Sequence, residues 1–430
     1  MRKAIKKIHL WMSIPFGLII SAVCLSGAAL VFEVEILEFL YPERYFVEPV
    51  SGENSPLSGE NSPFVKTPLP VNILIGNVVK TLPDTISVTS VSISADPRRA
   101  YRAGLSQPHR ATICVNQFTG EVLPPNPRPG FFMIMFRMHR WLMDSMRQDG
   151  GLFVGKLLTG WSTLVFVLII LSGLTIWIPR RLKTLKTSLR ISLNKGFRRF
   201  NYDFHLAAGF YAALLLLAMS LTGLTYSFPW YRTAFYRVFG VEASPYGARG
   251  GARAEGGDAA ENGSRGGREG GGSRGGGGRG GRGGGGGRGG VASVTDFSNW
   301  QNVYGQLKTA NPNFTQITVS NGTANVSFPH FGNRMASDQY TFDATSGELT
   351  GSTLYRNAEK SSKMRGWIMS VHFGTWGGML TRILSFLAAL AGGLLPLSGY
   401  CMWLKRTISR RRTRRKAALR TLPLRTANIP

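Results

Sequence analysis

Four histidines stand at matching places near the ends of long apolar runs, where few other side chains could bind a metal. His9 and His205 each lie 18 residues before a glycine, in "HLWMSIPFGLIISAVCLSG" and "HLAAGFYAALLLLAMSLTG". Because a helix rises 1.5 Å per residue, each would lie about 27 Å from its glycine, at equal depth. His139 and His372 precede the other two runs at looser spacings of 34 and 27 residues, which predicts a turn or short interfacial helix after each.

Matching depth pairs these histidines into two sites. His9 would meet His205 at one face of the membrane, and His139 would meet His372 at the other. Ionisable residues at membrane depth tend to face the interior of a bundle, and two histidines on facing helices can take both axial positions of one b-type haem. A pair alone offers too few ligands for a closed zinc site, and a proton relay would need carboxylates that the apolar runs lack.

Other residues near these histidines carry alternatives. Five methionines surround one histidine of the chain: Met133, Met135, Met138, Met143 and Met146 beside His139. They could build a His/Met haem site or a copper site, or they could be hydrophobic residues of an amphipathic interfacial helix. The remaining histidines, His109 and His330, could touch a substrate or lie on the surface.

A bound haem brings propionates, which need cations. Arg140, Lys156 and Arg382 are the candidates beside one pair, and Lys156 and Arg382 both stand 17 residues before their glycines. Further candidates are Arg365 at the same face and Lys6, Lys7, Arg198 and Arg199 at the other. Contact with lipid headgroups, or a role in setting topology, is the alternative for each.

Four apolar runs must position these residues, and each is long enough to cross a hydrocarbon layer, which takes roughly 20 helical residues. The runs span 8–32, 152–178, 205–230 and 380–404. Each carries a Leu-[Ser/Thr]-Gly motif, whose small residues predict close packing of helix backbones. The first run could also be a signal peptide, but it is long and lacks a clean cleavage site before Glu33, which favours a retained span.

Charge sets the expected topology. Lysine and arginine gather before the first run, between the second and third, and after the fourth, so the positive-inside rule predicts that both termini are cytoplasmic. The net charge of +28 then reflects topology and does not indicate a nucleic-acid partner. The three cysteines form no Cys-x-x-Cys-His motif, which excludes covalent c-type haem attachment.

The predicted fold class is an all-α four-helix transmembrane bundle with two small extracytoplasmic α+β modules. Each outer segment shows a helical pattern followed by alternating strands. A Gly/Arg-rich stretch over 247–290 predicts a flexible tether. The expected divisions are 1–32 (first span), 33–130 (first module), 131–180 (interfacial helix and second span), 181–204 (basic loop), 205–230 (third span), 231–290 (tether), 291–365 (second module), 366–404 (fourth span) and 405–430 (basic tail).

Taken as a set, the spans resemble the PepSY-associated transmembrane family, which includes bacterial inner-membrane reductases of ferric siderophores. The motifs that carry the resemblance are "IHLW" with "LSGAALVF", "MHRWL" with "LSGLTIWIPRR", "FHLAAG" with "LTGLTYSFPW", and "VHFGTWGG" with "LSGYCMWLKR". The outer segments resemble PepSY modules at "ATICVNQFTGEVL" and "YTFDATSGELT". The resemblance covers nearly the whole chain except the tether and the basic tail.

The resemblance implies an inner-membrane oxidoreductase with two haems b, each held by two histidines, with the ligands at His9, His139, His205 and His372. It implies electron flow from the cytoplasm to a periplasmic ferric siderophore, which holds Fe(III) tightly and Fe(II) weakly. The cytoplasmic segments carry no dinucleotide fingerprint, so the expected electron donor is a quinol or a separate reductase. Two alternatives stay open: a membrane-anchored PepSY binding or regulatory protein with structural histidines, and a haem b carrier with another acceptor such as Cu(II) or a quinone.

Overall fold

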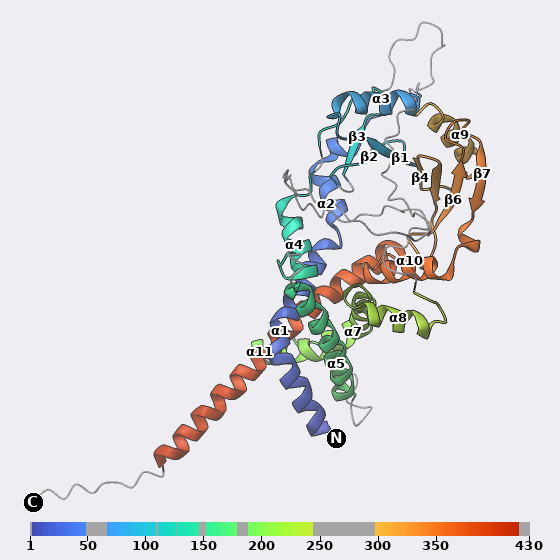
Figure 1. Cartoon of the computed structure of the whole chain (residues 1–430). Coiled ribbons are helices and arrows are strands. Elements are labelled where there is room, and N and C mark those ends of the chain that lie inside the picture. The colour runs from blue at the N-terminus through green and yellow to red at the C-terminus, as the bar shows by residue number, and fades with distance from the viewer. Residues whose placement is uncertain are drawn as a thin grey trace, which may run out of the picture.

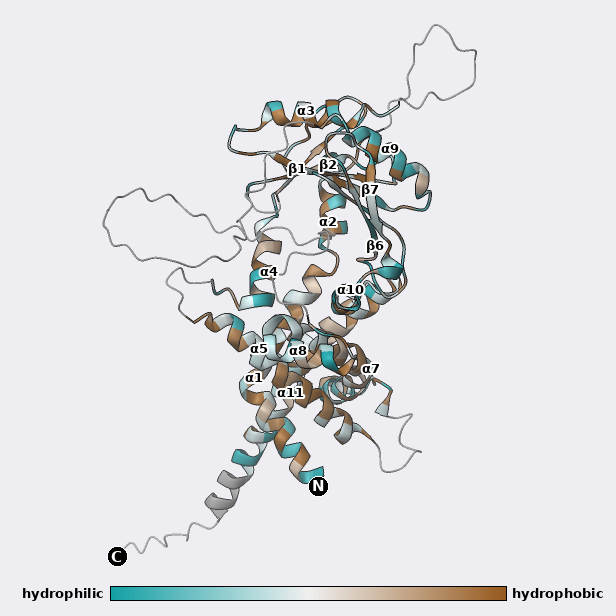
Figure 2. Cartoon of the chain, turned by 45° about the vertical axis from the view of Figure 1, so that its right-hand side comes forward, coloured by the Kyte–Doolittle hydropathy of each residue, from teal (hydrophilic) through white to brown (hydrophobic). Residues whose placement is uncertain are grey.

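Four long apolar helices form the body of the protein, as the sequence predicts (Figures 1 and 2). They are α1 (Arg2–Leu30), α5 (Val154–Trp177), α7 (Gly196–Ser227) and α11 (Gly378–Arg420). The computed structural model describes residues 2–48, 67–108, 111–125, 127–145, 152–178, 188–243 and 297–420. His109, Met146, the polar repeat at 51–64 and the Gly/Arg-rich stretch at 247–290 lie outside these residues.

The four helices surround a common apolar core. Helices α1 and α7 each contact both α5 and α11, so α1 faces α7 across the bundle. At mid-depth the bundle is filled by Ile20, Phe166, Ile170 and Leu216, together with small alanines. We call the end of the bundle that carries Arg2, Lys195 and Arg406 the basic end, and the opposite end, below the β-sheet in Figure 1, the sheet end.

Short helices and strands complete the described fold. The short helices are α2 (Glu33–Leu40), η1 (Pro42–Arg44), α3 (Val71–Thr81), α4 (Gly130–Trp141), α8 (Pro229–Val238), α9 (Trp300–Ala310), η3 (Tyr355–Asn357) and α10 (Lys360–His372). The strands are β1 (Val88–Ser94), β2 (Tyr101–Leu105), β3 (Thr112–Val115), β4 (Gln316–Ser320), β5 (Thr323–Ser327), β6 (Ser337–Phe342) and β7 (Leu349–Thr353). Helices α4 and α10 pack on α1 and α7 at the sheet end.

The two expected α+β modules are one unit, so the predicted fold class was wrong in this respect. A single antiparallel sheet has the strand order β3-β2-β1-β4-β5-β6-β7, and β1 pairs with β4 across the junction. Val91 lies opposite Val319, and the side chains of Ser92 and Thr318 share a hydrogen bond of 2.9 Å. Helices α3 and α9 bury their apolar residues in one cluster with both halves of the sheet. The chain is therefore a mixed α and β protein.

The same order of elements occurs twice. The first half runs α1, α3, β1 to β3, α4, α5, and the second runs α7, α9, β4 to β7, α10, α11. The equivalent strands β1 and β4 pair antiparallel with each other at the middle of the sheet, which is the arrangement that a two-fold relation produces. The sequence predicts this repeat from the motifs of the spans and from the helix-then-strand pattern of both outer segments, and the order of these elements in the structure agrees with it.

Helix α2 ties the sheet end together through its acidic side chains. Its three glutamates each pair with an arginine from a different part of the chain: Glu33 with Arg128, Glu35 with Arg382, and Glu38 with Arg99. The pair of Glu38 and Arg99 is 2.6 Å long and joins α2 to the loop between β1 and β2. The other two connect α2 to the segment before α4 and to α11.

Candidate functional site

Each of the four predicted ligand histidines rests on the glycine of a Ser/Thr-Gly pair in a different helix. A Cβ built on these glycines would come within 2.8–3.7 Å of an imidazole Cε1. The four contacts are His9 on Gly173, His139 on Gly27, His205 on Gly399 and His372 on Gly223. The sequence predicted these glycines as contacts between helix backbones, whereas in the structure imidazole rings occupy the space above them.

At the sheet end, the hydrogen bonds of the imidazoles fix their tautomer. His139 Nδ1 lies 2.8 Å from the carbonyl oxygen of Val23, and His372 Nδ1 lies 2.9 Å from that of Met219. A carbonyl can only accept, so Nδ1 carries the proton in both rings, and Nε2 keeps its lone pair. Burial lowers the pKa of His139 and lowers that of His372 to about 4. Both rings are therefore neutral at pH 7, the form that binds a metal.

At the basic end, serine hydroxyls have the same effect. His9 Nδ1 lies 2.9 Å from Ser172 Oγ, and that hydroxyl donates its hydrogen to the Ile169 carbonyl. The second histidine repeats the arrangement: His205 Nδ1 lies 2.6 Å from Ser398 Oγ, which donates to the Leu395 carbonyl. Because each hydroxyl hydrogen is already donated, Nδ1–H must donate to the oxygen, and Nε2 is again the atom with a free lone pair.

The structure pairs the histidines as their depth predicts. The rings of His139 and His372 have their centroids 6.1 Å apart and planes inclined at 45°. At the basic end, His9 lies over Gly173 of α5 and His205 lies over Gly399 of α11. Each pair takes one histidine from each half of the chain, so both pairs lie between the two halves.

The turns that follow α4 and α10 place the second pair. Helix α4 ends in left-handed backbone at Leu142 and Met143, with φ of 51° and 68°. Helix α10 ends at His372 and is followed by Gly374 and Gly378, which also have positive φ of 71° and 74°. Both short helices therefore end before the next span starts, as predicted from the loose spacing.

The donor set fits a planar macrocycle better than a bare metal ion. Among the described residues, no three His, Cys, Asp or Glu side chains lie together as metal ligands. A porphyrin supplies four ring nitrogens and needs only one protein ligand on each side. At metal–nitrogen bonds of about 2 Å, two such imidazoles would have centroids about 6 Å apart, close to the 6.1 Å between His139 and His372. The ring facing His139 is another imidazole, which favours a bis-histidine pair over the His/Met alternative.

The three cations predicted to bind haem propionates have different surroundings in the structure. Arg382 is bound to Glu35 and to the Val31 carbonyl, so its guanidinium is already engaged. The guanidinium of Arg140 lies 5.1 Å and 5.0 Å from the ring centroids of Phe136 and Trp141. Lys156 is exposed. Binding of a propionate by any of these cations stays a prediction.

The structure also places one of the two remaining histidines. His330 is exposed, and its ring packs on Tyr355 with 4.8 Å between centroids. Of the cations expected at the basic end, Arg198 and Arg199 line a pocket there together with residues of α11, whereas Lys6 and Lys7 are not among its lining residues.

Sequence reasoning missed the oxygens that orient the imidazoles. For His9 and His205, the acceptor of the Nδ1–H hydrogen bond is the hydroxyl of the serine just before the contacted glycine. For His139 and His372, the acceptor is the backbone carbonyl four residues before the contacted glycine. The available signal was the number of motifs, since four Ser/Thr-Gly pairs accompany four histidines. The carbonyls carry no sequence signal, because every residue has one.

Comparison with known proteins gives a match along almost the whole chain. The family model described as "PepSY-associated TM region" matches residues 6–406. The matched stretch contains all four histidines and all four glycines of the site. No curated protein matches the chain.

Proposed function

This chain belongs to the family of the PepSY-associated TM region, and we propose that it is a dihaem b reductase of the bacterial inner membrane. In this proposal His9 and His205 hold one haem and His139 and His372 hold the other. Both termini are cytoplasmic, and the sheet end faces the periplasm. Electrons pass from the basic end to a ferric siderophore or a similar ferric chelate.

The observation that supports this most is the common orientation of the four imidazoles. Each ring lies in the groove above a glycine and uses Nδ1 as a donor. Partners that fix the tautomer and angle of a ligating histidine typically account for 10- to 100-fold in metal affinity, by order of magnitude. Purely structural histidines would have no reason to share one orientation at four separate places.

The chain itself orients the ligands and excludes water. The carbonyls of Val23 and Met219 and the hydroxyls of Ser172 and Ser398 hold Nε2 ready to bind. Apolar side chains such as Phe166 and Leu216 fill the bundle at mid-depth, between the two pairs. When bound, the haems would supply one-electron exchange between their ferric and ferrous states.

The overall reaction is a one-electron reduction. One electron arriving at the sheet end converts the Fe(III) of a chelate to Fe(II), which the chelate holds weakly and releases. The electron comes from a quinol or a separate cytoplasmic reductase, because the segments assigned to the cytoplasm carry no dinucleotide fingerprint.

Haem content of variants tests the proposal. The full-length protein, purified with haem supplied during expression, should contain two haems per chain and show b-type bands in a reduced-minus-oxidised spectrum. His372→Ala and His9→Ala should each lose about one haem. The matched control is His330→Ala, which removes an exposed histidine that belongs to neither pair, and it should keep both.

The same preparation distinguishes the alternatives. A colourless protein at full expression, with an unchanged unfolding temperature, would contradict the proposal and favour a PepSY binding protein. If haem is bound, the reoxidation of reduced protein by a panel of ferric chelates, Cu(II) and quinones identifies the acceptor. If Cu(II) alone reoxidised the reduced protein rapidly, Cu(II) would be the substrate in place of the ferric chelate.

A further inference from the structure

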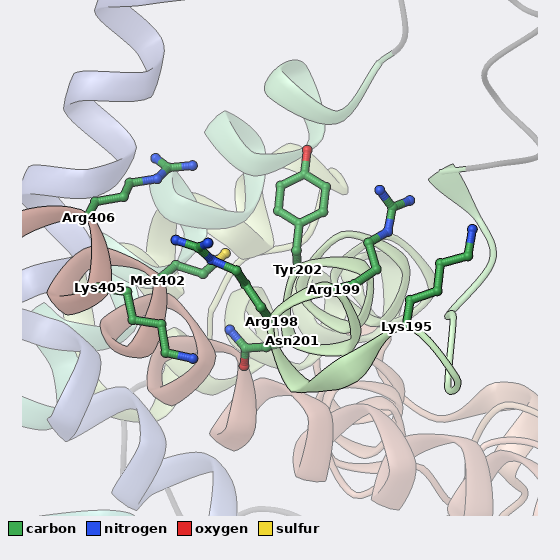
Figure 3. A pocket seen from close by; sticks show the side chains of 8 residues that line it. All are labelled: Lys195, Arg198, Arg199, Asn201, Tyr202, Met402, Lys405 and Arg406. Carbon is green, nitrogen blue, oxygen red and sulfur yellow. The ribbon is translucent and has the colours of Figure 1, made fainter. Parts of the chain in front are cut away.

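A strongly basic pocket of about 380 Å³ lies at the basic end of the bundle, where α7 begins and α11 leaves the bundle (Figure 3). We propose that this pocket binds the phosphodiester headgroup of an anionic phospholipid from the adjacent leaflet. This binding is independent of the proposed reductase activity, because it requires neither haem nor electron transfer.

The charge of the lining supports an anionic ligand. Five of the eight lining residues are cations, namely Lys195, Arg198, Arg199, Lys405 and Arg406. None of the eight described lining residues is acidic. Nearby Asp203 is bound to Arg199 at 2.9 Å and to the Ser192 backbone N–H, so it neutralises one cation of the five. The remaining charge favours a phosphate, which Lys and Arg bind well.

The helix start adds to this field. Helix α7 begins at Gly196, so its first backbone N–H groups, which have no partner within the helix, lie among these cations. The positive end of the helix dipole therefore reinforces the side chains. The pocket combines two independent sources of positive potential.

The position of the pocket indicates a lipid source for the phosphate. Next to the cations, Phe197 and Tyr202 are 62% and 42% exposed. Tyrosine is one of the two residue types enriched at the level where lipid headgroups meet the hydrocarbon. Basic pockets between membrane-spanning helices at the cytoplasmic side commonly hold anionic headgroups.

A bound headgroup would join α7 to α11 close to the histidine pair of the basic end. Lys405 of α11 already lies over the ring of Phe197 of α7, 4.8 Å from its centroid. Asn201, which lines the pocket, donates a hydrogen bond of 3.1 Å to the carbonyl oxygen of Ser398. The hydroxyl oxygen of the same Ser398 accepts a hydrogen bond from Nδ1–H of His205. One phosphate in the pocket would therefore stabilise the helix contact that orients His205.

Lipid binding to the full-length protein tests this inference. Native mass spectrometry in detergent should show phosphatidylglycerol bound far more tightly than phosphatidylcholine. Each cation near a membrane surface changes affinity about fivefold, so the double variant Arg198→Ala/Lys405→Ala should weaken phosphatidylglycerol binding about 25-fold. The variant Arg198→Lys/Lys405→Arg keeps the charges and should retain most of the binding, which separates loss of the site from loss of folding.

The matched control removes two exposed arginines further along α11, as Arg410→Ala/Arg411→Ala. It lowers the net charge equally and should leave phosphatidylglycerol binding unchanged. An equal loss in both double variants would overturn the proposal, because the effect would then be one of overall charge. Displacement of the lipid by millimolar inorganic phosphate would also overturn it and make the pocket a site for free anions.

Discussion

The four glycine contacts of the histidines differ in the room they leave. A Cβ on Gly27 would lie 2.8 Å from Cε1 of His139, so one of the two groups would have to move. A Cβ on Gly399 would lie 3.7 Å from Cε1 of His205, which is an ordinary van der Waals distance. Both glycines belong to a Leu-Ser-Gly motif, so the two positions differ in space and share their chemistry.

This difference predicts that adding one methyl group will disturb the protein at Gly27 and leave it unchanged at Gly399. Gly27→Ala should displace His139, lower the haem content of that pair, and destabilise the protein by about 1–3 kcal/mol through overpacking. Gly399→Ala should behave like the wild type. Both changes gain the same helix propensity, so that contribution cancels in the comparison.

Haem-to-protein ratio and unfolding temperature, measured on both variants in the same detergent, check this prediction. The unfolding temperature reports the clash even in preparations without haem. Equal behaviour of the two variants would show that the imidazole does not occupy the space above Gly27.

At the scale of the elements, helix α2 is held in position by ion pairs. Its eight residues carry few apolar contacts of their own, and only Leu37 is buried. Its position therefore depends on the ion pairs of Glu33, Glu35 and Glu38. The pair of Glu35 and Arg382 is notable because the arginine is only 12% exposed and belongs to a spanning helix.

We expect this pair to stabilise the protein at neutral pH and not in acid. Hydrogen bonds from Arg382 hold the pKa of Glu35 below its ordinary value of 4.5. A carboxyl with a lowered pKa in the folded state contributes stability above its unfolded pKa and loses it as the pH falls through the folded value. Since Glu35 is 38% exposed, solvent screening limits the contribution to about 1 kcal/mol.

Thermal unfolding of Glu35→Gln against the wild type at pH 7 and near pH 4 measures this contribution. The variant should unfold at a lower temperature at pH 7, and the difference should shrink in acid. Glu43→Gln is the control, because the Glu43 side chain is 59% exposed and its contact with Arg44 is 3.6 Å long. A difference for Glu35→Gln that stays constant with pH would contradict the assignment.

The sequence predicts spans and their histidines better than it predicts contacts between distant segments. The four apolar runs and the equal depth of His9 and His205 follow from length and spacing alone. The pairing of β1 with β4 cannot be predicted in this way, because the sequence of a strand does not indicate which strand it pairs with. These two strands are also separated by more than two hundred residues. The partner of Arg382 was likewise hidden, since an arginine near a predicted haem and one that binds Glu35 look alike in sequence.

At the scale of the whole molecule, the sheet and the bundle join the same two halves. Strands β1 and β4 hold the halves together at one end, and α1 and α7 contact the spans of the other half along the bundle. The 247–290 stretch lies within the second half, between α8 and α9, and the contacts of β1 with β4 and of α11 with α1 and α7 join described residues on its two sides. We therefore expect the residues before this stretch and those after it to stay associated without the covalent connection that the stretch provides.

We expect a chain cut within 247–290 to stay assembled. A site for a specific protease, inserted after Gly270, allows the cut after purification. The cleaved protein should elute as one particle in mild detergent, with the absorbance and unfolding temperature of the uncut protein, and should separate into two fragments only on denaturation. Separation in mild detergent would show that the two fragments depend on the connection.

The antiparallel pairing of equivalent strands has a consequence for the origin of the core. A polypeptide half as long would contain one histidine of each pair, one central strand and two spans. Two identical copies, related by an axis through the sheet and bundle, would complete both histidine pairs with no new type of contact. The present chain has the arrangement that fusion of such a homodimer would give, in which the equivalent residues Ser172 and Ser398 are identical while Ser26 and Thr222 differ.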